Sequence, residues 1–437
     1  MPDLKPSQES DFMIEKIKER PINKKKLLRR TIITASMAVI FGLIACLTFL
    51  LLEPVISNWL HPEEPPAVVE IPDETEEILP EDMLVEDEPE IMIPENNILN
   101  KDQIDQILSG VELGVEDYRE LYSSVNTYIA EMNKSIVTVT GAVSNVDWFN
   151  EAYKSEGFAS GVIFYNNGNE YLILLDRTPI IRAETLTVTF FDGTEVGATI
   201  KQYDSNTNLA VVSVPLDKVQ NDLEQKISVA PLGMSSTKNL PGTPIIVLGS
   251  PMGVPGSVCQ GMITSVGTTL NIADANYKLI QTDVFGSQNA GGIIFDFKGQ
   301  ILGIVTNGKT SSDMKNLVAA YGISELKKMM TKMGNGEELA YMGIVGTDVT
   351  ATANEDMGVP YGAYIKEIYM NSPAMRTGIQ RGDVITEMNG VAIERYVDYV
   401  NAILLQKPED VVSVKVMRQA QDAYKEMTFE VTLESTR

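Results

Sequence analysis

The sequence predicts a mainly β protein, in which a barrel-like all-β domain precedes a small α+β module. One transmembrane helix and an acidic, disordered linker are expected in front of them. Three observations carry this prediction: an uncharged apolar run at 31–52, a Pro/Glu/Asp-rich stretch at 53–100, and many β-branched segments separated by Gly, Pro, Asn and Asp turns. A length of 437 residues favours two or three folded units.

Residues 31–52 form an apolar run of 22, and roughly 20 such residues cross a bilayer as a helix. Five basic residues lie close before it, whereas 53–100 contain no Lys or Arg, which predicts that 1–30 are a cytoplasmic basic tail and the rest is extracytoplasmic. A cleaved signal peptide has a shorter apolar core and a small-residue cleavage site. We therefore expect a retained single-pass anchor in the cell membrane.

The linker at 53–100 is rich in Glu, Asp and Pro and shows no helical or strand period. Like charges and proline favour an extended, solvated spacer. The alternative is a cation-responsive or partner-binding acidic tract, for which the segment has no specific motif.

The overall charge of −25 repels phosphate backbones, so no nucleic-acid partner is expected. The two cysteines are Cys46, inside the apolar run, and Cys259, so a disulfide framework is excluded and Cys259 is expected to be a small buried hydrophobe. The single histidine, His61, lies in the linker. A zinc site of nitrogen and sulfur ligands cannot be assembled from these residues, and no metal or cofactor is expected.

The all-β domain is predicted over 101–330. It begins with a helix whose apolar residues recur at intervals of three and four and are expected to pack on a first strand at 135–143. These residues are Tyr118, Leu121, Tyr122, Val125, Ile129 and Met132. Strand-like runs TLTVTFF, NLAVVSV, TPIIVLG and QILGIVT follow, without alternating helices, which indicates a barrel-like fold.

A short amphipathic helix, SELKKMMTKM, leads into the second module, predicted over 338–435. Strand-like stretches YMGIVG, GAYIKEIY, DVITEMNG and VSVKVMR surround a helix, VDYVNAILLQ. About 90 residues of this mixed pattern are typical of a small α+β domain.

Several blocks of the β region resemble the HtrA/Deg family of trypsin-like serine proteases in order and spacing. They read SGVIFYNNGNEYLILLDRTPII, TVTFFDGTEVGATIKQYDSNTNLAVVSV, LGSPMGVPGSVCQGMITSVG and QTDVFGSQNAGGIIFDFKGQILGIVTN. The last module is similar to the PDZ domain that follows the protease domain in this family. The resemblance spans about 120–435 and implies a trypsin-like double β-barrel followed by a PDZ-like domain.

A protease of this kind needs a nucleophilic serine, a histidine base and an orienting aspartate. Where the family has Gly-Asn-Ser-Gly-Gly, this chain has Gln-Asn-Ala-Gly-Gly at 288–292, so Ala290 stands at the nucleophile position. The histidine position falls on Thr178, or on Arg177 or Pro179 if the register is off by one. The family's Asp-Leu-Ala-Val is matched by Asn208-Leu-Ala-Val.

The loop at Gln288 and Asn289 is also altered, because Gln288 replaces a glycine whose N–H lines the family's oxyanion hole. These departures predict a catalytically degenerate pseudoprotease. A Ser–Lys dyad using Ser287 is the alternative. Ser287 is instead expected to stabilise a turn, since it lies in the run Gly-Ser-Gln-Asn at 286–289, which is rich in turn formers.

In the family, a Tyr-Leu-Gly-Ile-like loop of the PDZ domain receives a peptide's terminal carboxylate. Here the loop reads Tyr341-Met342-Gly343-Ile344. Successive N–H groups in such a turn form an anion-binding nest, and the neighbouring strand edge can pair with an extended peptide. Peptide binding is therefore expected at these residues, and a module that is only a spacer with a closed groove is the alternative.

The resulting hypothesis is a membrane-anchored, inactive HtrA-like protein that binds unfolded or C-terminal peptide segments of envelope proteins. It would act as an adaptor, decoy or chaperone-like partner in protein quality control. The alternatives are an active HtrA-like endopeptidase with a rearranged site and a structural or assembly scaffold. The resemblance also implies a homotrimer.

Overall fold

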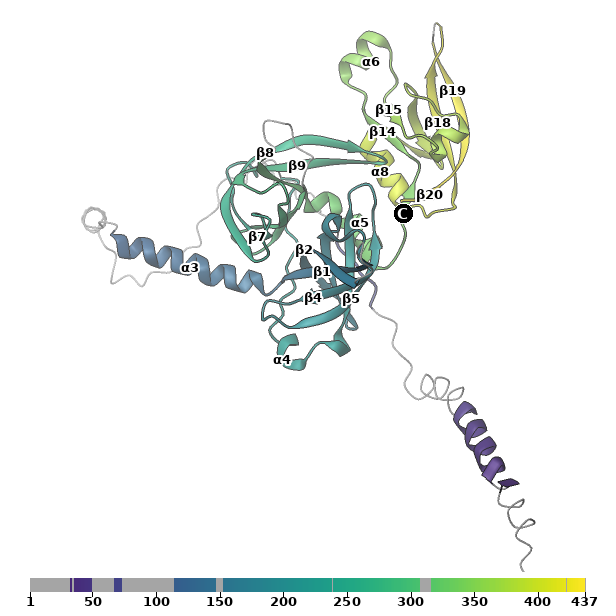
Figure 1. Cartoon of the computed structure of the whole chain (residues 1–437). Helices are drawn as coiled ribbons and strands as arrows, with labels where there is room; N and C mark the ends of the chain where they lie inside the picture. The colour runs from purple at the N-terminus through teal and green to yellow at the C-terminus, as the bar shows by residue number, and fades with distance from the viewer. Residues whose placement is uncertain are drawn as a thin grey trace, which may run out of the picture. The chain divides into compact units, whose positions relative to one another are not determined.

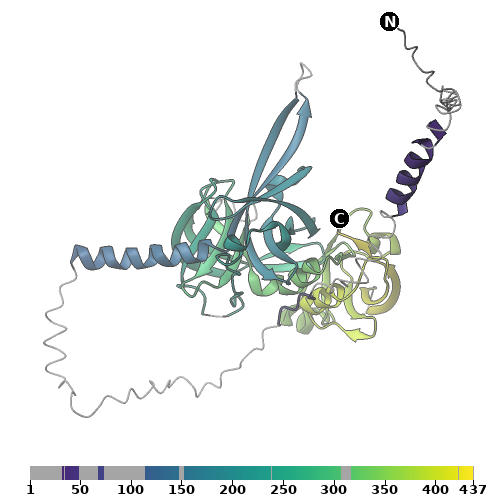
Figure 2. The ribbon, with the colours of Figure 1, turned by 90° about the horizontal axis from the view of Figure 1, so that it is seen from below.

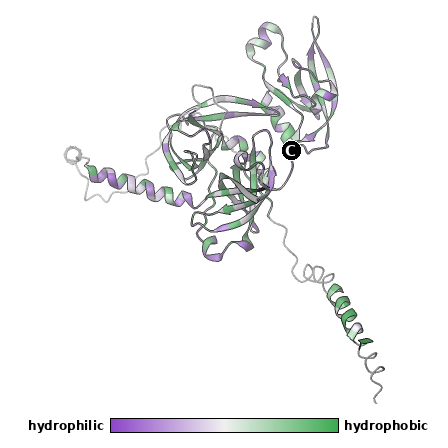
Figure 3. Cartoon of the chain, in the orientation of Figure 1, coloured by the Kyte–Doolittle hydropathy of each residue, from purple (hydrophilic) through white to green (hydrophobic). Residues whose placement is uncertain are grey.

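The computed structural model describes residues 32–33, 35–48, 67–72, 114–146, 152–237, 239–306, 316–421 and 423–436 (Figure 1). The chain divides into two compact units, Met1–Pro65 and Pro66–Arg437. The described residues of the first unit, 32–33 and 35–48, are helical, and Figure 3 shows them as strongly apolar. Within the described residues, no helix has the length and hydropathy of a membrane span. The rest of the predicted span and the basic tail 1–30 lie outside the described residues.

Part of the predicted linker, residues 67–72, belongs to the second unit and packs on its core. Val69 is only 1% exposed; its N–H donates to Asn335 Oδ1 at 2.8 Å, and Asn335 Nδ2 donates to the Val69 carbonyl at 3.1 Å. Ile71 packs on the same core. The expectation of a solvated spacer is therefore wrong for 67–72, because this short apolar segment supplies side chains that fill the core. Residues 53–66 and 73–100 lie outside the described residues.

Six strands close a first barrel in the order β1-β2-β3-β6-β5-β4. They are β1 (Ile136–Val146), β2 (Ala152–Asn166), β3 (Glu170–Asp176), β4 (Thr185–Thr189), β5 (Glu195–Tyr203) and β6 (Leu209–Pro215). Inward-facing β-branched residues such as Val139, Ile163 and Val212 are fully buried and form its core. A one-turn helix, η2 (Thr178–Ile180), follows β3, and η3 (Leu216–Lys218) and α4 (Asn221–Glu224) follow β6.

Six further strands close a second barrel in the order β10-β11-β12-β9-β8-β7. They are β7 (Pro244–Ser250), β8 (Ser257–Ile272), β9 (Ala275–Phe285), β10 (Gly291–Asp296), β11 (Ile301–Thr306) and β12 (Leu317–Gly322). β8 and β9 form a long hairpin whose last pair is Ile272 with Ala275, which leaves a two-residue turn. The prediction of a mainly β, two-barrel domain is confirmed.

Helix α3 (Val115–Asn133) precedes the first barrel and projects from it (Figure 2). Its apolar stripe was expected to pack on the first strand, but Tyr118 is 63% and Leu121 is 60% exposed. Met132 is the buried residue of the helix, and Val125 and Ile129 pack partly on the core. The expected packing is therefore found only at the C-terminal end, because the helix axis carries its first turns beyond the barrel surface.

Helix α5 (Ile323–Gly334) leads from the second barrel to the last domain. There, β14 (Ile344–Asp348), β15 (Ala363–Ile368), β16 (Val384–Met388), β18 (Val411–Gln419) and β19 (Tyr424–Thr432) form one antiparallel sheet, and β17 (Val391–Ala392) pairs with β16. β13 (Ala340–Tyr341) pairs with β20 (Glu434–Ser435). Helices α6 (Ala351–Met357), α7 (Pro373–Thr377) and α8 (Tyr396–Leu404) complete the predicted α+β domain.

Candidate functional site

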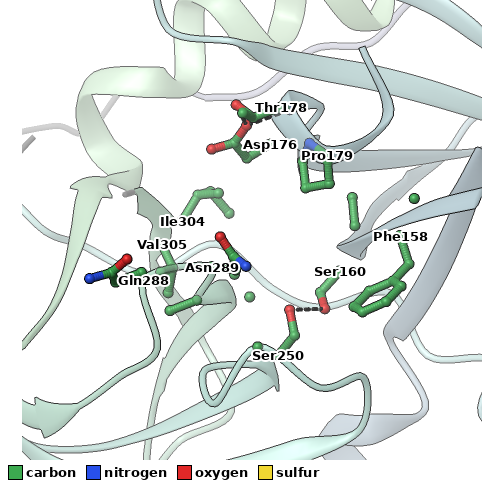
Figure 4. Close-up of a pocket in the computed structure, with 16 residues that line it drawn as sticks. Phe158, Ser160, Asp176, Thr178, Pro179, Ser250, Gln288, Asn289, Ile304 and Val305 are labelled. Atoms are coloured by element: carbon green, nitrogen blue, oxygen red, sulfur yellow. Dashed lines mark hydrogen bonds between the residues drawn. The ribbon is translucent and has the colours of Figure 1, made fainter. Parts of the chain in front are cut away.

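Residues of both barrels line one cleft of about 420 Å³ (Figure 4). Gly157, Phe158, Ala159, Ser160, Asp176, Thr178 and Pro179 come from the first barrel, and Ser250, Gly253, Gln288, Asn289, Ala290, Gly291, Gly292, Ile304 and Val305 from the second. The cleft brings together four of the five residues that the sequence singles out for the degenerate site. Among these lining residues there is no histidine, lysine or cysteine.

The loop before β10 places Ala290 in the wall of the cleft, where it is 4% exposed, while Gln288 and Asn289 are exposed. The N–H of Ala290 donates to the Ser287 carbonyl at 3.0 Å, and the N–H of Asn289 donates to Ser287 Oγ at 3.1 Å. Ser287 therefore acts within the turn, as expected. In a trypsin-like site, the N–H of the residue at the Ala290 position is an oxyanion donor. Here that N–H donates its hydrogen bond to the Ser287 carbonyl within the turn.

Thr178 begins η2 at the edge of the cleft and is held by Asp176, the last residue of β3. Asp176 Oδ1 accepts from the N–H of Thr178 at 2.8 Å and from Thr178 Oγ1 at 2.5 Å. Figure 4 shows the two side chains grouped on one wall. This is the geometry of a side-chain-capped turn. Sequence reasoning missed Asp176, although an aspartate two residues before a threonine at a strand end is a recognisable turn signal.

The structure does not bring Asn208 into the cleft lining. Asn208 adopts a left-handed backbone with φ of 62°, and its carbonyl accepts from the N–H of Arg177 at 2.9 Å. Arg177 is buried, and its guanidinium lies 3.7 Å from the centre of the Tyr203 ring. Burial lowers the pKa of Arg177. The main chain of Asn208 is thus bonded to a residue whose guanidinium stacks on Tyr203.

A second pair missed by the sequence lies deeper in the cleft. Ser160 Oγ donates to Ser250 Oγ at 2.9 Å, and both residues are buried. Figure 4 shows this pair joining a strand of each barrel. The two serines are 90 positions apart, so no local motif connects them. Their bond joins β2 of the first barrel to β7 of the second.

The second predicted site is the loop Tyr341–Ile344, called the carboxylate loop below. Gly343 has φ of 86°, and a Cβ there would lie 2.3 Å from Ser372 Cβ, so only glycine fits. The N–H groups of Met342, Gly343 and Ile344 all point to one place, where they donate to the side chain of Asp274 at 2.7, 2.7 and 3.0 Å. The loop thus binds a carboxylate, and burial raises the pKa of the adjacent Tyr341 to about 12.

Neither site has the composition of a metal centre. Across the described residues, no group of three or more His, Cys, Asp or Glu side chains is arranged to hold a metal ion. Cys259 is half-buried, and burial raises the pKa of its thiol, so the thiolate nucleophile is disfavoured. His61 lies outside the described residues.

Comparisons with known proteins agree with both domains. Residues 159–304 match the trypsin-like peptidase domain family, and residues 340–433 match the PDZ domain family. The serine protease Do-like HtrA of Bacillus subtilis is 27% identical over 339 residues, which cover 71% of this chain and 73% of that protein. Serine protease Do-like HtrB of the same organism is 28% identical, covering 60% of this chain and 59% of that protein.

A probable periplasmic serine endoprotease DegP-like of Marinomonas is 28% identical and covers 63% of this chain, with the match spanning 56% of that relative. The chain thus spans less than two thirds of two of these three relatives. The solved HtrA-type protease AlgW with tripeptide has a TM-score of 0.50 at 23% identity, covering 70% of this chain and 97% of that one. AlgW with decapeptide also has a TM-score of 0.50, at 20% identity, covering 70% and 98%. These two likenesses show the fold.

Two closed six-stranded barrels enclose a cleft, a PDZ-type sheet with an intact carboxylate loop follows them, and the family matches fall on the same two segments. The chain therefore has a trypsin-like peptidase domain followed by a C-terminal PDZ domain, and it is similar to bacterial HtrA-type proteases.

Proposed function

We propose that this protein is a membrane-anchored pseudoprotease of the HtrA type that binds extended or C-terminal peptide segments outside the cytoplasm. In this role it serves as an adaptor, decoy or chaperone-like partner in envelope protein quality control. The observation that carries the proposal is the composition of the cleft. A methyl group, Ala290, occupies the place of the attacking hydroxyl, and Thr178 occupies the place of the base.

Hydrolysis in this architecture requires an activated side-chain oxygen, a proton acceptor beside it and N–H donors around the developing oxyanion. Thr178 is a neutral hydroxyl whose proton is directed to Asp176 within a turn. The N–H of Ala290 is directed to Ser287. The missing hydroxyl at Ala290, the neutral side chain of Thr178 and the use of the Ala290 N–H within the turn support the proposal of an inactive site. A cleft of about 420 Å³ remains available to an extended polypeptide.

Peptide binding by the PDZ domain is supported by the carboxylate loop. Its three N–H groups converge on one carboxylate with distances of 2.7 to 3.0 Å, which is the geometry that recognises a terminal carboxylate. The solved AlgW structures with a tripeptide and a decapeptide support the same assignment by likeness.

Membrane anchoring is proposed from the uncharged run at 31–52 and from the absence of Lys and Arg in 53–100. Alkaline extraction of membranes tests it, because an integral anchor stays in the pellet and a peripheral protein is released. A homotrimer is proposed by analogy with the family, and sedimentation equilibrium of the purified protein tests it.

An active endopeptidase with a rearranged site is the competing function, and it would need the Thr178–Asp176 pair, the Ser160–Ser250 pair or Ser287. Incubation of the purified protein with casein and with a serine-directed fluorophosphonate decides between the two. We expect neither cleavage nor labelling. Stoichiometric labelling that Ser287→Ala or Ser160→Ala abolishes would reject the pseudoprotease.

A further inference from the structure

The turn of the β8–β9 hairpin carries an aspartate to the PDZ domain. Ala273 and Asp274 form this two-residue turn, and Asp274 has φ of 57°, which an aspartate tolerates better than most residues. In Figure 1 the hairpin reaches from the second barrel to α8. Ala273 is 1% and Asp274 is 6% exposed, so the turn is enclosed rather than free in solvent. Asn206 of the first barrel supports it by donating to the Ala273 carbonyl at 3.4 Å.

The carboxylate of Asp274 receives four hydrogen bonds from the PDZ domain. Three come from the carboxylate loop, at 2.7 Å from Met342, 2.7 Å from Gly343 and 3.0 Å from Ile344. The fourth comes from Tyr399 Oη on α8, at 2.5 Å. The N–H groups of Met342, Gly343 and Ile344, which converge on one place, are thus already donated to Asp274.

The main chain of Asp274 makes a further bond at the same place. Its N–H donates to the Ile344 carbonyl at 2.8 Å. One residue therefore supplies both an N–H for the edge of β14 and a carboxylate for the loop. The last residue of a peptide that adds to a sheet edge beside an anion nest offers these same two groups. In hydrogen bonding, Asp274 imitates a C-terminal residue.

We propose that Asp274 is an internal ligand of the carboxylate loop, so that an external peptide with a free C-terminal carboxylate binds only after the β8–β9 turn withdraws. This inference rests on the proposed peptide-binding function. The apparent affinity for a peptide is then the intrinsic affinity reduced by the fraction of molecules in which the turn has withdrawn.

The chemistry of the contact suits a ligand that can be displaced. Burial raises the pKa of Asp274, while the four donated hydrogen bonds oppose that rise. The hydrogen-bond donors to the carboxylate are three backbone N–H groups and a tyrosine O–H, all of them neutral dipoles, and these hydrogen bonds offset the cost of removing the carboxylate from water. A peptide carboxylate can make the same bonds, and withdrawal restores water to Asp274.

The test compares the full chain with D274N and D274G, because asparagine and glycine both accept φ of 57° and neither supplies a carboxylate. D283N is the matched control, since Asp283 is an exposed carboxylate on the same hairpin whose Oδ1 accepts from Met262 at 2.7 Å. Thermal unfolding of each variant verifies folding. Amide hydrogen exchange at Met342, Gly343 and Ile344 reports on the contact, and fluorescence anisotropy with a labelled peptide ending in an apolar residue reports on binding.

We expect exchange at the three amides to be at least about tenfold faster in D274N and D274G than in wild type and D283N. We expect the Kd for the peptide to fall at least about tenfold in the same two variants. The same peptide with an amidated C-terminus should bind to none of the four proteins. Equal exchange and equal affinity in all four proteins would overturn the internal ligand while leaving peptide binding intact. Faster exchange without any peptide binding would support the internal contact and reject the proposed function.

Discussion

The cleft between the barrels and the carboxylate loop of the PDZ domain are two sites of one family fold with opposite outcomes. In the cleft, the chemistry of trypsin-like proteases depends on side chains, and we propose that Thr178, Asn208 and Ala290 stand at the triad positions. In the loop, recognition depends on three backbone N–H groups, which remain in place and hold a carboxylate. A site made of side chains is lost by substitution, whereas a site made of backbone persists as long as the loop keeps its conformation.

The largest expected difference concerns catalysis. Removing the triad costs about a millionfold in turnover, so we expect casein cleavage by the purified protein to be about 10⁶-fold slower than that of an active HtrA relative assayed beside it. A290S alone should restore nothing measurable, because Thr178 cannot take the proton of the new hydroxyl. A rate near that of the relative, or recovery by A290S, would show that the cleft can still support catalysis, and the proposed difference between the two sites would be wrong.

A backbone site should be sensitive to a glycine that sets its conformation. We expect G343A to lower the free energy of unfolding by about 3 kcal/mol, because the new Cβ would lie 2.3 Å from Ser372 Cβ at a φ of 86°. G358A is the control, with φ of 63° and no atom within 4 Å, and should cost about 1 kcal/mol. Urea unfolding measures both, and equal losses would show that the close contact at Ser372 is not the cause.

The hairpin that carries Asp274 is supported by a second carboxylate, that of the partly buried Glu325. Its Oε2 accepts from the N–H of Lys278 at 2.7 Å, and burial raises its pKa to about 7. The unfolded chain releases this proton near its usual pKa, so between about pH 4.5 and pH 7 the folded state binds more protons and stability falls as pH rises.

We therefore expect E325Q, which keeps the carbonyl acceptor and cannot ionise, to exceed wild type by about 2–3 kcal/mol at pH 8. The advantage should shrink as pH falls and vanish near pH 4.5. Urea unfolding at pH 5, 6.5 and 8 measures it. An advantage that is the same at every pH would mean that Glu325 does not titrate in this range.

The smallest effect is expected for the serine pair below the cleft. S160A and S250A each remove one partner of a buried 2.9 Å hydrogen bond and should cost about 1 kcal/mol of unfolding free energy. The double variant should cost less than the sum of the two, because the second change removes a hydroxyl that has already lost its partner. Strict additivity would show that the bond does not connect the barrels energetically.

Much of the fold could be predicted from local patterns. The runs at β6, β7 and β11 are bounded by turn residues, and each strand lies where its β-branched run predicts it. The apolar stripe of α3 predicted the helix but not its packing, because periodicity shows which face is apolar and not whether a partner reaches it; Tyr118 and Leu121 remain exposed. The acidic, proline-rich composition also predicted a solvated spacer at 67–72. This prediction is wrong because Val69 packs on a core formed by residues far from it in the sequence.

By itself, the sequence determined which chemical groups are present: a methyl at Ala290, an amide at Asn208, and a glycine that allows the loop at Gly343 its positive φ. It also determined the order of the two domains through the spacing of their strands. Only the tertiary structure decided that Asp274, 68 to 70 positions before the loop residues, supplies their carboxylate. This contact depends on where the turn of the long β8–β9 hairpin lies in the folded protein. A local sequence pattern does not predict a contact between residues so far apart in the chain.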